Sequence, residues 1–201
     1  MTAISIRGLF FIAETPPASK PEFDISQRDY SAIQIKSLAM HESVTQMWQS
    51  FLAANAQQTT FPDHEISTFH FCDNQTDADQ CAALVLKGIK RATASSLAEL
   101  QLHNIPIPRQ DDLHVVTDFA GVAQCIIRTV QVDILRFADI TETHAPLEGE
   151  GEGSLAHWRA AHIGYFSRVL KDTPLQIDDD LLIAFEQFEV VFPERSPEAT
   201  E

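Results

Sequence analysis

The sequence has few cysteines, few basic residues and no long hydrophobic run, and each shortage excludes a class of protein. The three cysteines, Cys72, Cys81 and Cys125, are an odd number without paired spacing, which argues against a disulfide framework and against a zinc site. Their apolar neighbours predict small buried residues. No apolar run approaches the roughly 18 residues needed to cross a bilayer, and residues 9–13 are too short a stretch for a signal peptide. We therefore expect a cytoplasmic protein with no membrane partner.

Basic residues are the second shortage. The chain has 14 lysines and arginines against 29 acidic residues, which gives a formal net charge of -15. Since nonspecific affinity for nucleic acid comes mostly from basic groups that neutralise phosphates, we expect no binding to duplex DNA. Lys87, Lys90 and Arg91 form the one tight basic cluster. This cluster is either a local binding patch or an ordinary solvated helix end.

The length and the apolar content predict one globular domain. Of 201 residues, 44% are hydrophobic and 13 are phenylalanine, enough to form a core. Residues 1–40 lack sustained periodicity and carry prolines between positions 16 and 21, so we expect an N-terminal extension. The folded domain then covers residues 41–192. Residues 193–201 are polar and are predicted to be a disordered tail.

Two helices are predicted before residue 90. The first begins at Glu42, because its apolar residues follow helical spacing on one face. That face consists of Val44, Met47, Trp48, Phe51 and Leu52. The second covers residues 76–87, with Thr76 as N-cap and Gly88 as the C-terminal stop.

The middle and the end of the chain favour strands. Residues 89–93 indicate a short strand or extended turn, and Ser96 to Glu99 is a capping-box signature that opens a third helix. Further strands are predicted at residues 113–117, 122–129, 132–135 and 182–192, with a hairpin loop at 118–121. Helices first, then strands in an antiparallel meander, and a closing strand predict an α+β fold.

Between these strands lies a loop in which carboxylates alternate with glycines. It contains Glu148, Glu150 and Glu152 and is followed by Ser154, a plausible cap for a helix. The predicted inner face of that helix comprises Leu155, Trp158, His162, Phe166 and Val169. We interpret Trp158 as a core residue rather than a base-stacking platform, and His162 as a packed histidine.

Three segments resemble the ASCH family of the PUA-like superfamily. They are residues 84–95, 112–129 and 145–159, and the glycine and glutamate stretch followed by Ser-Leu and Trp-Arg is the most specific part. The similarity runs from about Val44 to Phe192. It implies a PUA-like small β-barrel with flanking helices, and a superfamily associated with RNA and modified nucleosides.

Family members include RNA-binding or coactivator modules, a ribonuclease-like activity and a small bacterial amidohydrolase that acts on N-acetylcytidine. The catalytic residues of that amidohydrolase match Lys90, Thr93 and Glu148 here, with Ala145 three residues before the glutamate. The resemblance thus implies an amidohydrolase acting on a small acylated nucleoside or a related amide. The present chain differs from that enzyme in being about twice as long and in carrying the additional acids Glu150 and Glu152.

The chemistry of such a site is plausible for these residue types. A threonine hydroxyl needs a neighbouring base, and a lysine can serve if burial lowers its pKa. Lys90 would then activate Thr93 or hold the developing oxyanion, with Glu148 relaying a proton, and the roles of Lys90 and Glu148 can be exchanged. Because positions 90 and 93 differ by an odd offset, a turn or bulge must bring them together.

The expected substrate is a small nucleoside-like molecule. We expect substrate contacts from Lys87, Arg91, Ser95 and Glu150, no cofactor and no metal. One alternative is a noncatalytic module that binds a nucleotide or short single-stranded RNA. The other is a metal-dependent ribonuclease, since carboxylates alternating along a loop can bind a hard cation.

Overall fold

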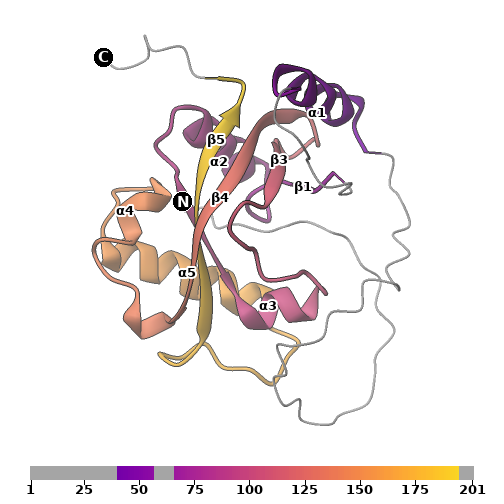
Figure 1. Cartoon of the computed structure of the whole chain (residues 1–201). Helices are drawn as coiled ribbons and strands as arrows, with labels where there is room; N and C mark the ends of the chain where they lie inside the picture. Colours follow the sequence, from indigo (N-terminus) through magenta and orange to yellow (C-terminus); the bar gives the residue numbers. More distant parts are fainter. Residues whose placement is uncertain (1–39, 57–65, 195–201) are drawn as a thin grey trace.

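In the computed structural model, residues 40–56 and 66–194 are described, and they form one mixed sheet with helices around it (Figure 1). The predicted extension, apart from Met40, and the tail from residue 195 lie outside the described residues. The helices are α1 (Glu42–Ala54), α2 (Gln75–Leu86), α3 (Leu97–Leu102), α4 (Ala145–Glu148) and α5 (Leu155–Val169), with a 3₁₀ turn η1 at Phe137–Asp139. The strands are β1 (Thr68–Phe69), β2 (Ala92–Ser96), β3 (Leu113–Thr117), β4 (Ala123–Arg136) and β5 (Leu182–Phe192).

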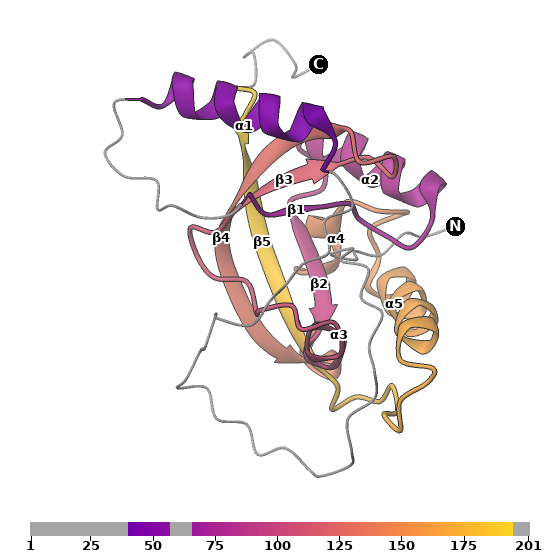
Figure 2. The same cartoon turned by 90° about the vertical axis from the view of Figure 1, so that its right-hand side faces the viewer.

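The sheet has the strand order β1-β3-β4-β5-β2. β1 pairs with β3 in parallel, and the other three pairings are antiparallel. Figure 2 shows the long, curved β4 and β5 at its centre. The α+β class is confirmed, but the predicted barrel is not closed, because β1 and β2 remain at opposite ends of the order. With only two residues, β1 is too short to form a second ladder with β2.

Two strand predictions are corrected by the backbone pairing. The strands predicted at 122–129 and 132–135 are one strand, β4, whose pairing with β5 shifts register between Thr129 and Gln131. A register shift bends a strand without ending it. The strand predicted at 89–93 begins only at Ala92, because the amide of Lys90 donates to Leu84 O of α2 instead of to a neighbouring strand.

The helix predictions are largely confirmed, and the caps explain the ends. α1 begins at Glu42 as predicted. α2 begins one residue earlier than expected, because Asn74, not Thr76, is the N-cap and accepts a hydrogen bond from the amide of Asp77. Ser96 caps α3 and Ser154 caps α5, each accepting from an amide three residues later. These hydroxyls satisfy amides that have no partner within the helix.

The sheet separates two apolar clusters. One lies toward α5 and includes Ala92 and Ala94 of β2 together with Trp158. Another includes Phe71, and Phe188 of β5. Because successive side chains of a strand point to opposite faces, Thr93 lies on the side opposite Ala92 and Ala94.

The three cysteines are buried, as predicted. They lie among the apolar side chains around Phe71, and Cys72 and Cys81 place their sulfur atoms 3.6 Å apart. Within residues 40–56 and 66–194, no helix combines the length and the apolar character needed to cross a bilayer.

Candidate active site

The site is built around Lys90, in the segment that joins α2 to β2. Gly88 adopts a left-handed φ of 71°, which ends α2 and turns the chain. The amide of Arg91 then donates to Leu147 O at 2.8 Å, which ties this segment to α4. The side chain of Lys90 points inward and is only 1% exposed. Its ammonium lies 5.0 Å from the ring centroid of Phe71.

Glu148 meets this ammonium from the last residue of α4. The sequence indicated a loop here, but residues 145–148 form one helical turn that ends at Gly149, whose φ is 67°. One carboxylate oxygen of Glu148 lies 3.2 Å from Lys90 Nζ, and the other accepts a 2.6 Å hydrogen bond from Trp158 Nε1. Residues 58 positions apart in the sequence thus form a buried ion pair.

α5 supplies two aromatic residues that hold Glu148. The rings of Trp158 and His162 stack with centroids 3.7 Å apart, and His162 Nε2 lies 3.4 Å from Glu148 Oε1. Both side chains are buried, as predicted. Their contact with Glu148 was not predicted. The sequence does contain a signal for this contact. Trp158 and His162 lie one turn apart on a helix whose cap, Ser154, directly follows the acidic loop.

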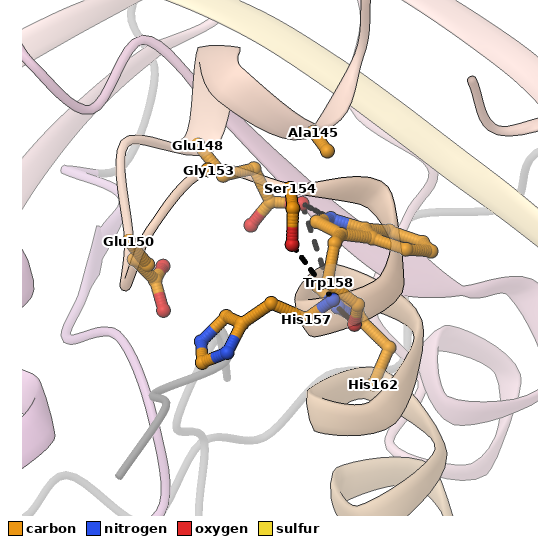
Figure 3. Close-up of a pocket in the computed structure, with 8 residues that line it drawn as sticks. All are labelled: Ala145, Glu148, Glu150, Gly153, Ser154, His157, Trp158 and His162. Carbon is orange, nitrogen blue, oxygen red and sulfur yellow. Dashed lines mark hydrogen bonds and ion pairs between the residues drawn. The ribbon is translucent and has the colours of Figure 1, made fainter. Parts of the chain in front are cut away.

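Glu150 provides a second carboxylate for the same ammonium. Its Oε1 lies 2.5 Å from Lys90 Nζ, while its buried Oε2 has no hydrogen-bond partner among the described residues. Figure 3 shows Trp158 and His162 on α5, with Glu148 and Glu150 on α4 and the loop that follows it. Lys90 therefore binds two acids at once.

The charges of this cluster depend on one another. Burial opposes the charge of Lys90, but Glu150 and Glu148 outweigh that effect and raise its pKa. Burial also opposes ionisation of Glu148, yet Lys90, His162 and Trp158 together lower its pKa to about 2. For Glu150, burial and the neighbouring Glu148 outweigh Lys90, and its pKa is raised. Lys90 is therefore a fixed positive charge in this state, not a base.

Thr93 is buried in β2, where it lies opposite Glu186 of β5. Its hydroxyl has no hydrogen-bond partner among the described residues. It shares its side of the sheet with Phe188, whose ring packs 6.2 Å from that of Phe71, and Phe71 in turn lies under the Lys90 ammonium. Lys90 also pairs with Glu148, which accepts a hydrogen bond from Trp158 on the side of Ala92 and Ala94, so these contacts join Lys90 and Glu148 but do not bring Thr93 to them.

The other predicted substrate contacts have different locations. Lys87 and Arg91 are exposed on either side of buried Lys90, and Ser95 is buried within β2. A small pocket lies beside Glu148 and Trp158. Of the four residues predicted to contact substrate, only Glu150 lines this pocket. The pocket has a volume of about 10 Å³, which corresponds to roughly one water molecule. Its lining comprises Ala145, Glu148, Glu150, Gly153, Ser154, His157, Trp158 and His162.

The three acids of the loop do not converge on one point. Glu148 and Glu150 contact Lys90, whereas Glu152 is exposed and accepts a hydrogen bond from Ser154 Oγ at 2.8 Å. Within the described ranges, no three His, Cys, Asp or Glu side chains are grouped as metal ligands. Between Glu148 and Glu150, the cation is the lysine itself.

The family model of the ASCH domain matches residues 67–192, which include every residue of the cluster around Lys90. The chain belongs to the ASCH family. The resemblance of the three sequence segments to this family is therefore confirmed.

Solved ASCH structures have the same fold. An ASCH domain from Lactobacillus crispatus JV V101 is 29% identical, with a TM-score of 0.68, over 76% of this chain and 96% of that one. Protein EF3133 from Enterococcus faecalis V583 is 28% identical, with a TM-score of 0.65, over 74% of this chain and 88% of that one. No curated protein matches the chain.

Proposed function

We propose that this ASCH protein hydrolyses the amide bond of a small acylated nucleoside, of which N-acetylcytidine is the model. The observation that carries the proposal is the buried contact between Lys90 and Glu148, 3.2 Å between Nζ and Oε2. Thr93 adds a buried hydroxyl with no hydrogen-bond partner among the described residues, three positions after Lys90 in the chain. A buried polar group without a structural partner is a candidate for a functional one.

The electrostatics support one assignment of roles. Thr93 Oγ1 attacks the acyl carbon and transfers its proton to Glu148, while the Lys90 ammonium stabilises the oxyanion. Glu148 starts as a weak base, with a pKa of about 2. Its basicity rises as Lys90 turns its charge toward the oxyanion, because the carboxylate loses a positive neighbour.

The second half of the reaction reuses the same proton carrier. Glu148 returns the proton to the leaving nitrogen as the C–N bond breaks, which leaves an acyl ester on Thr93. Water then attacks this ester and gives a proton to Glu148. Glu148 passes that proton to the Thr93 oxygen as the carboxylic acid leaves. No redox partner or cofactor is required for this sequence.

A small substrate fits the charge of the chain. A net charge of -15 repels a long polyanion, whereas an acylated nucleoside without phosphates is neutral. The site is also enclosed rather than an open basic groove. A role with free nucleosides agrees with our expectation of a cytoplasmic location.

The test is an assay of the purified chain against a panel of acylated nucleosides, with release of free nucleoside followed by chromatography. We expect turnover of at least one substrate. Lys90→Ala, Thr93→Ala and Glu148→Gln should each lower turnover by about a hundredfold or more. The control, Glu152→Gln, changes an exposed acid outside the ion pair and should stay within a few fold. Absence of turnover across the panel would reject the proposal, and full activity of Glu148→Gln beside inactive Lys90→Ala would leave a site built on Lys90 alone.

A noncatalytic RNA- or nucleotide-binding module is the second candidate. The exposed Lys87 and Arg91 flank the site and offer phosphate contacts. Fluorescence anisotropy with short single-stranded RNA at physiological salt tests this reading. Binding that is lost in Lys87→Ala and Arg91→Ala, with no hydrolysis of any acylated nucleoside, would favour it.

A metal-dependent ribonuclease receives less support. A divalent cation would have to replace Lys90 between Glu148 and Glu150, although the ammonium already pairs with both. Cleavage of short RNA that requires Mg²⁺ and is lost in both Glu148→Gln and Glu150→Gln would revive this candidate.

A further inference from the structure

Lys90 is held by two carboxylates that differ in how firmly they are themselves held. Glu148 uses one oxygen for Lys90 and the other for Trp158 Nε1, at 2.6 Å, and it lies beside His162. Glu150 contacts Lys90 through Oε1 and has a buried Oε2 without a hydrogen-bond partner among the described residues. A buried carboxylate oxygen without a partner is costly. Glu150 is therefore the more easily displaced of the two acids.

The present arrangement leaves no room for a substrate. The pocket beside Glu150 has a volume of about 10 Å³, and Lys90 is 1% exposed. A nucleoside reaches the ammonium only if part of the wall moves. Glu148 is anchored to α5 through Trp158, so the movable part of the wall is the loop that carries Glu150.

That loop contains three glycines, and at two of them, Gly149 and Gly151, a Cβ would clash with a neighbour. Gly149, Gly151 and Gly153 all have positive φ, at 67°, 58° and 72°. A Cβ on Gly151 would lie 2.1 Å from His157 Nε2, and one on Gly149 would lie 2.7 Å from the backbone of Ile89. A Cβ on Gly153 would meet nothing closer than 3.9 Å. The loop can press Glu150 onto Lys90 because residues 149 and 151 have no side chains, and glycine also lets it move away at low steric cost.

We propose that Glu150 is a displaceable internal ligand, which closes the site by occupying the position on Lys90 that a substrate carbonyl oxygen takes when the loop at 149–153 opens. Both groups are oxygen acceptors for the same ammonium. The same position accepts a free carboxylate, the product of amide hydrolysis. The identity of the incoming carbonyl rests on the proposed function, whereas the opening of the loop does not.

Chemical labelling of Lys90 tests the opening without any turnover. The purified chain is treated with formaldehyde and a borane reductant, and methylation of Lys90 is followed by peptide mass spectrometry. We expect slow labelling in the unmodified chain and a rate at least tenfold higher in Glu150→Gln and in Gly151→Ala. Gly151→Ala keeps every charge, strains the loop at a φ of 58° and displaces the imidazole of His157 that packs against it, so it separates loosening of the loop from the loss of a carboxylate.

The controls are Glu152→Gln and Gly153→Ala. The first removes a charge from the same loop, and the second places an alanine at a similar positive φ without the clash. Both should label Lys90 within twofold of the unmodified rate. Circular dichroism and thermal unfolding confirm that each variant is folded, so that labelling reports the loop. Acetate should slow labelling of Gly151→Ala by occupying the vacated position.

Equal labelling of Lys90 in all five proteins would overturn the proposal, and so would equal acceleration in the two controls. If acetate leaves the labelling rate of Gly151→Ala unchanged, the claim that Lys90 offers a position for a free carboxylate is wrong. If labelling behaves as expected but no acylated nucleoside is turned over, the displaceable ligand stands and the proposed hydrolase activity falls.

Discussion

Two buried glutamates in this protein have pKa values shifted in opposite directions, although they are almost equally hidden from water. Glu148 is 2% exposed and Glu99 is 3% exposed. Glu148 meets the Lys90 ammonium, and its pKa falls to about 2. Glu99 accepts hydrogen bonds from the Tyr165 hydroxyl and from the backbone at Ser96, and it has no cationic partner among the described residues. Burial is the largest effect on Glu99 and raises its pKa to about 7.

The difference shows that a buried acid needs a counter-ion to stay charged, and Glu150 shows that the same counter-ion does not suffice when burial and a second acid oppose it. Desolvation opposes ionisation at both sites, and a neutral hydroxyl donor offsets only part of it. The Lys90 cluster therefore keeps charges inside the fold. The Glu99 pair holds a proton near neutral pH.

The strongest way to break this comparison is to remove the counter-ion. Lys90→Met keeps a long apolar side chain but leaves Glu148 and Glu150 buried without a positive partner. We expect a loss of about 3 to 5 kcal/mol in the free energy of unfolding, measured by urea titration at pH 7. In Lys87→Met the same change falls on an exposed lysine and should cost less than about 0.5 kcal/mol. A loss below about 1 kcal/mol in Lys90→Met would contradict a charged cluster.

The second test replaces Glu99, the buried acid whose pKa is raised to about 7. In the folded state, Glu99 has a pKa of about 7, above its ordinary value of 4.5, so the folded chain binds more protons than the unfolded chain between these values. The contribution of Glu99 to the free energy of unfolding is therefore fully present below about pH 4.5. It is lost as the pH rises through 7, and the loss is up to about 3 kcal/mol. Glu99→Gln stays neutral and can still accept from Tyr165. It should remove this decline.

The measurement is the free energy of unfolding of both proteins from pH 5 to pH 8. Other titrating groups contribute equally to the two curves, so the difference between them isolates Glu99. The difference should grow in favour of Glu99→Gln as pH rises. Two parallel curves would show that Glu99 is ionised throughout.

Much of the fold follows from local sequence signals. α1, α5, β3 and β5 have the predicted positions, because helical spacing, hydroxyl caps and β-branched runs act within a few residues. The two residues of β1 and the single turn of α4 were missed. They depend on distant partners, namely pairing with Val115 and Val116 and the hydrogen bond from Arg91 to Leu147.

The site shows the same limit. Resemblance to the ASCH family drew attention to Lys90, Thr93 and Glu148, and the structure brings two of them, Lys90 and Glu148, into contact. The direct contact of Glu150 with Lys90 was not predicted. It depends on α4 turning the chain at Gly149, a conformation set by close approach to Ile89 rather than by any periodic pattern.

The smallest expected effect on stability concerns Thr93, which is a third kind of buried polar group. Glu148 has a cation and Glu99 has a hydroxyl donor, but the Thr93 hydroxyl has no hydrogen-bond partner among the described residues. Thr93→Val replaces that hydroxyl with a methyl group of similar size in a strand that suits branched residues. Since nothing is lost but an unsatisfied group, we expect stability to be unchanged or raised by about 1 kcal/mol.

Thermal and urea unfolding of Thr93→Val measure this effect, and Thr129→Val is the matched control. Thr129 is also buried in the sheet, but its hydroxyl donates to Glu186 at 2.5 Å, so its removal should cost about 1 to 3 kcal/mol. If Thr93→Val costs as much as Thr129→Val, the Thr93 hydroxyl has a structural partner and is not free to act as a nucleophile. If Thr93→Val leaves stability unchanged or higher while turnover of an acylated nucleoside disappears, the hydroxyl serves the chemistry and not the fold.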